Sequence, residues 1–227
     1  MNLKRSLATV FFGAAACLGA GQSQAAFTFD SAGDSITTLY EYAYAPGTFL
    51  SASITYTLQS FSGSTANFAV SVSNTTAAGQ TGTNRLTSFG VGVITPDLSG
   101  TQIDNSSIFT VKNGGSVDSN VGWVDFCATA ATSCAGSTTG GVSEGLTHNF
   151  NMTLRFVSTI TSSGVIFDEP FYVRYQPAGA NGGIVVAEGC IAGTPGCGGQ
   201  IPEPGSLALA SLALLGLGVT VRRRRQA

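Results

Sequence analysis

Residues 49–61 read FLSASITYTLQSF, and apolar and polar residues alternate along the middle of this stretch. The apolar residues fall on one side of an extended chain and the polar residues on the other: Ala52, Ile54, Tyr56 and Leu58 against Ser53, Thr55, Thr57 and Gln59. A period of two with β-branched and aromatic residues predicts a strand that has one buried face.

The next stretch, residues 66–73, reads ANFAVSVS and alternates in the same way. Phe68, Val70 and Val72 are expected to point inward. Because only a short turn at residues 62–64 separates the two stretches, they are predicted to form a β-hairpin.

Similar stretches lie on both sides of this hairpin, at residues 26–30, 36–44, 85–94, 108–112, 121–126, 146–159, 165–167, 171–176 and 183–187. The run Asn113-Gly114-Gly115 is expected to separate two of these strands, and Pro170 to lie in a loop. No segment between residues 26 and 200 has a capped helical period. The sequence therefore predicts an all-β fold, a single antiparallel β-sandwich over residues 26–200, immunoglobulin-like or jelly-roll in type.

The first 25 residues read as a secretory signal peptide. Lys4 and Arg5 precede an apolar stretch at residues 7–18, and small residues at 23–25 offer a cleavage site after Ala25. Export by the Sec machinery and removal by signal peptidase are the expected consequences.

Residues 201–227 form the other signal. Residues 205–221 are apolar and uncharged, and as a helix they would span roughly 25 Å, the low end for a transmembrane helix. The four arginines that follow, Arg222, Arg223, Arg224 and Arg225, should stop translocation and hold the end of the chain on the cytoplasmic side of the inner membrane. An ordinary single-pass tail anchor would explain the helix and the arginines, but it gives Pro202, Glu203 and Pro204 no role.

This order of a Pro-Glu-Pro element, an apolar helix and an arginine cluster resembles the PEP-CTERM sorting signal of Gram-negative bacteria. The resemblance implies that Pro202, Glu203 and Pro204 are recognised by an exosortase, a membrane protease. It also implies an exported protein of the cell surface or extracellular matrix, associated with exopolysaccharide or biofilm.

The region between the two signals is acidic and poor in charge. Four basic and eleven acidic residues lie between residues 26 and 200, which gives a net charge of −7. Nucleic-acid binding depends on a basic surface that releases counterions, so nucleic acid is not an expected partner.

Four cysteines lie in this region, as two pairs with the same spacing: Cys127 and Cys134, then Cys190 and Cys197. In an oxidising compartment they are expected to form disulfides, and three connectivities are possible. Pairing within each short loop is favoured, while crossed pairing stays open. A zinc site is not expected, because six residues between paired ligands exceed the usual spacing.

The sequence offers little for catalysis. His148 is the only histidine, and its position within a predicted strand favours a structural role. Asp168 and Glu169 are adjacent, so they would point to opposite faces of a strand, and they read as solvated turn acids. No enzyme activity, metal or cofactor is therefore expected.

Trp123 and three tyrosines, Tyr40, Tyr42 and Tyr44, are the candidates for stacking on sugar rings. The tyrosines are expected to be buried, and Trp123 is expected to pack on a disulfide at Cys127. The sequence thus predicts an exported structural protein, with a carbohydrate-binding module that organises exopolysaccharide as the alternative.

Overall fold

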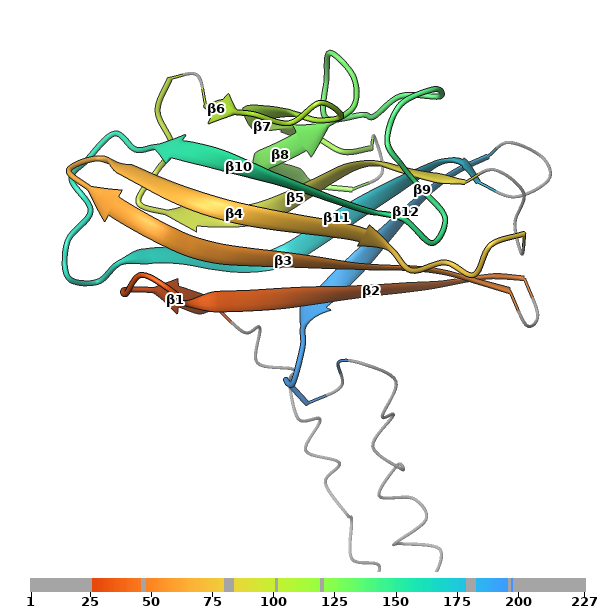
Figure 1. The fold of residues 1–227 in the computed structure, drawn as a ribbon, viewed down its shortest axis with the longest axis horizontal. Coiled ribbons are helices and arrows are strands. Elements are labelled where there is room, and N and C mark those ends of the chain that lie inside the picture. Colours follow the sequence, from red (N-terminus) through yellow and green to blue (C-terminus); the bar gives the residue numbers. More distant parts are fainter. Residues whose placement is uncertain are drawn as a thin grey trace, which may run out of the picture.

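A computed structural model describes residues 26–45, 48–79, 84–100, 102–118, 121–178, 183–195 and 197. All the regular structure in these residues is β, and the strand pairings are antiparallel (Figure 1). The strands are β1 (Phe27–Phe29), β2 (Ser35–Ala45), β3 (Thr48–Ser62), β4 (Thr65–Asn74), β5 (Arg85–Thr95), β6 (Ile103–Asp104), β7 (Thr110–Ser116), β8 (Trp123–Thr129), β9 (Val142–Ser143), β10 (Thr147–Arg155), β11 (Val165–Ala178) and β12 (Gly183–Ile191). The predicted all-β class is confirmed.

The strands form a single sheet in the order β6-β10-β4-β3-β2-β12-β11-β5-β8-β7, with β1 added on β11 and β9 on β5. In Figure 1, β10, β4, β3 and β2 make one layer and β11, β5 and β8 lie behind it. The prediction of two separate sheets, as in an immunoglobulin-like or jelly-roll sandwich, is wrong in this respect. The two layers are hydrogen-bonded to each other through β2 and β12.

The joint between the layers is short. Among the described residues, Thr38, Leu39 and Tyr40 of β2 pair with β12, and the carbonyl of Thr37 accepts the N–H of Ala192, just after β12, at 2.8 Å. At this joint the Tyr40 ring lies directly over Gly189, where an added Cβ would stand 2.3 Å from Cε1 of the ring. A glycine is needed here because any side chain would push the two strands apart.

The two ends of the sheet, β6 and β7, also approach each other, and side chains connect them. The Asp104 carboxylate accepts a hydrogen bond from the backbone N–H of Val111 at 2.9 Å and another from Ser106 at 3.1 Å. The sheet therefore encloses a core between its layers, with its ends tied by side-chain bonds instead of strand pairing.

Aromatic rings fill the space between the layers. Phe167 of β11 meets Phe29 of β1 edge-on at 4.9 Å and Tyr56 of β3 at 5.3 Å between ring centroids. Phe68 of β4 packs on the same ring at 5.4 Å. The alternation predicted for the middle of the hairpin is confirmed, since the predicted inward residues are buried and the residues between them are not: Ala52, Ile54, Tyr56 and Leu58 of β3, and Phe68, Val70 and Val72 of β4.

Two expected interruptions are instead parts of strands. Asn113-Gly114-Gly115 lies within β7, and Pro170 lies within β11 at a register shift between Asp168 and Phe171. A bulge tolerates proline because the extra residue need not donate to the ladder. Gly92 of β5 faces this proline, and an added Cβ there would lie 2.2 Å from Cδ of Pro170.

The signal peptide at residues 1–25 and the tail at residues 201–227, with its expected helix at about 205–221, lie outside the described residues. Within the described ranges, no helix has the length and hydropathy to cross a bilayer.

Candidate functional site

Trp123 is the first residue of β8. The expectation that it packs on the disulfide at Cys127 is wrong, because the side chain is largely in solvent. Its side chain is 69% exposed, the largest exposure among the large apolar residues that the structure describes. The indole lies against Gly114 of β7, where an added Cβ would stand 2.8 Å from Nε1. Gly114 also has a φ of +53°, so both the backbone and the indole require glycine at this position.

The indole forms one wall of a hollow of about 250 Å³. The hollow is lined by residues from the segment after β5 and from β7 and β8: Asp97, Leu98, Asn113, Gly114, Trp123 and Asp125. We call this the Trp123 groove. It combines an aromatic surface with two carboxylates and an amide.

The walls of the Trp123 groove are held by hydrogen bonds. Oδ2 of Asp125 accepts the backbone N–H of Ile94 at 3.0 Å. The backbone carbonyl of Asp97 accepts the N–H of Val157 at 2.9 Å, which ties the segment after β5 to the segment after β10. The Asp125 carboxylate is therefore held by its own hydrogen bond, and the backbone of Asp97 is held by Val157.

The Asn113 amide is fixed as well. Its Oδ1 accepts a hydrogen bond from Nε2 of Gln102, and its Nδ2 donates to the carbonyl of Gly100. Gln102 is 5% exposed, and its Oε1 accepts the backbone N–H of Arg155 at 2.6 Å. Gln102 thus connects the Asn113 amide of β7 to Arg155 of β10.

Several groups in the groove have unused hydrogen-bonding capacity. Within the described part of the chain, the Asp97 carboxylate, Oδ1 of Asp125 and the indole N–H of Trp123 make no hydrogen bond. An apolar ring face beside such acceptors suits a ligand that has an apolar face and a rim of hydroxyl groups. A sugar ring has this character.

The structure pairs the cysteines locally, Cys127 with Cys134 and Cys190 with Cys197. The first disulfide is buried with Val117, Val124 and Tyr172, and an added Cβ at Gly115 would lie 2.5 Å from Sγ of Cys134. Two neighbouring glycines of β7 thus contact different groups: Gly114 packs against the Trp123 indole, and Gly115 packs against the disulfide.

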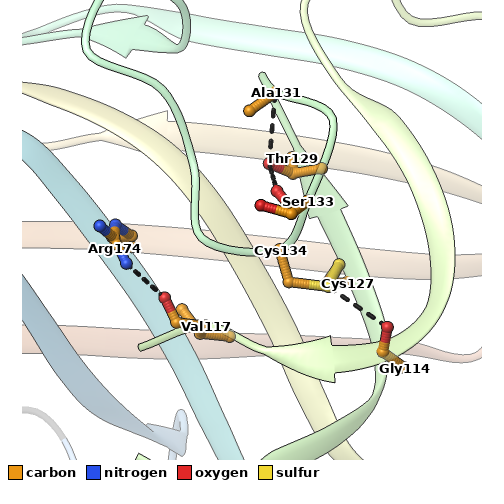
Figure 2. The surroundings of a disulfide bond; sticks show 8 residues. All are labelled: Gly114, Val117, Cys127, Thr129, Ala131, Ser133, Cys134 and Arg174. Carbon is orange, nitrogen blue, oxygen red and sulfur yellow. Dashed lines mark hydrogen bonds between the residues drawn. A yellow bond between two sulfur atoms is a disulfide. The ribbon is translucent and has the colours of Figure 1, made fainter. Parts of the chain in front are cut away.

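Polar contacts order the surroundings of this disulfide (Figure 2). The Thr129 hydroxyl donates to the carbonyl of Ser133 at 2.7 Å and accepts the N–H of Ala131 at 3.2 Å. Arg174 of β11 donates to the carbonyl of Val117 at 2.6 Å and pairs with Asp118 at 3.4 Å. Burial lowers the pKa of Arg174, and the Asp118 carboxylate acts in the opposite direction.

The three tyrosines of β2 differ in their surroundings. Tyr40 is buried, Tyr44 is partly buried against the core, and Tyr42 is 41% exposed. The expectation of burial is therefore wrong for Tyr42. The pairing of β2 with β12 ends at Tyr40, so beyond that residue the pairing that the described residues show for β2 is with β3.

His148 has a structural environment. One of its ring nitrogens, Nε2, lies 2.9 Å from the Ser106 hydroxyl, and the ring stacks on Phe150 at 5.8 Å between centroids. Among the described residues, no group of three or more His, Cys, Asp or Glu side chains is arranged to hold a metal ion.

The predicted sorting residues, Pro202, Glu203 and Pro204, and the arginines 222–225 lie outside the described residues. The comparison with known families nevertheless covers them. Residues 200–225 match the model of the PEP-CTERM protein-sorting motif. No curated protein and no solved structure matches the chain.

Proposed function

Since the chain carries a PEP-CTERM sorting motif, which marks an exported protein that an exosortase processes at the membrane, we propose that it is a non-enzymatic structural protein of the cell surface or extracellular matrix. The motif at residues 200–225 is the observation that carries this proposal. Association with exopolysaccharide in a biofilm is part of it.

The proposed sequence of events begins at the signal peptide, residues 1–25. Sec export and signal peptidase give a chain that starts near Ala26 and remains held in the inner membrane by residues 205–221 and the arginines after them. Exosortase then recognises Pro202-Glu203-Pro204 and cuts, and the folded domain is released or attached at the surface.

The folded domain has features that suit a hydrated matrix. The outer face of β2, β3, β4 and β10 carries rows of uncharged hydroxyl and amide side chains. In one row Thr37 pairs with Thr55, Thr55 with Ser71 and Ser71 with Asn149. The Thr37 and Thr55 hydroxyls are 2.8 Å apart. Such a face can exchange hydrogen bonds with water and with polysaccharide.

Replacing both prolines of the motif tests the sorting proposal. Pro202→Ala/Pro204→Ala removes the rigid element ahead of the membrane helix, so we expect the protein to accumulate at full length in the membrane fraction. Gln226→Ala, just outside the matched residues, is the control and should be processed normally. Normal processing of the double variant would contradict the proposal.

The Trp123 groove supports a second candidate function, a carbohydrate-binding module that organises exopolysaccharide. The specific observation is an exposed indole beside two carboxylates that have free acceptor oxygens. Screening the exported protein and its Trp123→Ala variant on a glycan array separates the candidates. Binding that Trp123→Ala abolishes supports the module, and a lack of binding to every glycan supports a purely structural role.

A further inference from the structure

We propose that the Trp123 groove binds neutral sugar units of a polysaccharide and that its two carboxylates exclude acidic sugars such as uronates. This inference rests on the carbohydrate-binding function above and specifies the class of ligand. Three features of the groove carry it: the indole surface, the charge of its lining and its fixed geometry.

The indole supplies the stacking surface. Trp123 is 69% exposed, and its ring lies against Gly114. An exposed aromatic ring of this size gains most from a flat ligand that has an apolar face. The C–H face of a pyranose provides one, and a charged or small ion does not.

The polar lining of the groove is unbalanced toward acceptors. An ionised carboxylate accepts hydrogen bonds and cannot donate them, so Asp97 and Oδ1 of Asp125 require a ligand that donates. Sugar hydroxyls donate. A uronate carboxylate would instead bring a like charge next to Asp97 and Asp125, and the lining contains no cation to offset it.

The surrounding charge acts in the same direction. Residues 26–200 carry a net charge of −7, with only four basic residues. One of these, Arg174, is 6% exposed and paired with Asp118, so it adds little positive potential outside the protein. An acidic polymer is therefore repelled before it reaches the groove.

Binding of a sugar requires little further ordering of the side chains that line the groove. Asn113 is fixed by Gln102 and Gly100, and Asp125 by the N–H of Ile94. A ligand that enters such a site loses less free energy to the ordering of side chains. We assign Gln102 as a positioning residue, because it acts on the groove through Asn113.

Trp123 is the only tryptophan of the chain, so its emission reports directly on this site. The experiment titrates the full-length protein, in micelles of a detergent without a sugar head group, with cellohexaose and maltohexaose and in parallel with oligogalacturonate of similar length. We expect a saturable change in emission with at least one neutral hexasaccharide, and binding of oligogalacturonate at least about tenfold weaker.

Matched variants test the role of charge. Asp97→Asn/Asp125→Asn keeps the shape of both side chains and removes both charges, so it should reduce the preference for the neutral ligand by about tenfold. The Trp123→Ala variant has no tryptophan emission, so its binding is measured by calorimetry. It should lose binding while its circular dichroism stays unchanged. Asn113 should hold its place in the double variant, because Gln102 is untouched.

Three results would overturn the inference. Oligogalacturonate that binds as tightly as the neutral ligands would remove the selectivity while leaving a carbohydrate-binding module. Binding that disappears on chelation of divalent cations would assign the carboxylates to a metal. No change in emission with any glycan would remove the module itself, and none of these results bears on sorting at residues 200–225.

Discussion

Among the described residues, three tyrosines lie in the main core cluster, Tyr40, Tyr56 and Tyr175, and their burial favours the neutral form. Burial raises the pKa of Tyr40, Tyr56 and Tyr175 above the ordinary value of 10.0. Tyr40 has a partner, since its hydroxyl oxygen accepts a hydrogen bond from Thr38 at 2.9 Å. A negative charge on any of these oxygens would have to form between the two layers of the sheet.

This burial predicts a loss of stability in alkali. Because the folded pKa values are raised, the stabilisation is complete below about pH 10 and is lost as the pH rises above that value toward the folded pKa values. Absorbance at 295 nm should therefore show a group of tyrosines that ionise only when the circular dichroism shows unfolding. Ionisation of all six tyrosines of the folded protein near pH 10 would contradict the burial.

Gly92 is a second residue whose identity is fixed by packing. An added Cβ would lie 2.2 Å from Cδ and 2.6 Å from the backbone N of Pro170, and neither the proline ring nor the backbone can turn aside. Gly92→Ala should lower the free energy of unfolding by about 3 kcal/mol, measured by urea denaturation. Gly122→Ala is the control, since an added Cβ there has no atom within 4 Å, and equal stability of the two variants would be the contrary result.

At the residue level, the sequence predicts burial well where alternation is regular and poorly where a tertiary contact decides. Tyr56 and Phe68 are buried as their strands predict. Trp123 is exposed because the segment around Asp97 lines a groove beside it instead of covering it. That segment is far from Trp123 in the sequence, so no local pattern records their proximity.

At the level of elements, the first disulfide supports the strands that present the Trp123 groove. Cys134 packs against Gly115 of β7, and the adjacent Gly114 packs against the Trp123 indole. Closing a loop of eight residues removes unfolded-state entropy worth about 2.5 kcal/mol. The Cys127–Cys134 bridge adds burial among Val117, Val124 and Tyr172 to this effect.

Removal of each disulfide should therefore have unequal effects. Cys127→Ser/Cys134→Ser should lower the free energy of unfolding by more than about 2.5 kcal/mol. Cys190→Ser/Cys197→Ser should lower it by about 2.5 kcal/mol or less. Guanidinium denaturation of the two double variants beside the unchanged protein measures both values. A smaller effect from the first pair would contradict the role given to its burial.

The elements that the sequence predicts best are the longest and most regular. The hairpin of β3 and β4 follows from alternation and from the turn between them. By contrast, β6 and β9 have two residues each, too few to show a period. The glycines of β7 and the proline of β11 resemble strand ends, but each is explained by a neighbour: the disulfide at Gly115 and Gly92 at Pro170.

At the scale of the whole molecule, the connection between the layers could not be predicted. It depends on a short pairing of β2 with β12, two strands at opposite ends of the described chain. Sorting was easier to predict, because the Pro-Glu-Pro element, the apolar run and the arginines are contiguous and residues 200–225 match the motif. The Trp123 groove could not be predicted from the sequence, because its lining residues come from separate segments of the chain.

The most direct test of the account is the intact mass of the protein isolated from cells with and without exosortase activity. With exosortase, we expect a chain that begins after Ala25, lacks Arg222–Arg225 and contains two disulfides. Without exosortase, the arginines should remain and the protein should stay in the membrane fraction. The same uncut chain, with all thiols free, in both kinds of cell would contradict the account.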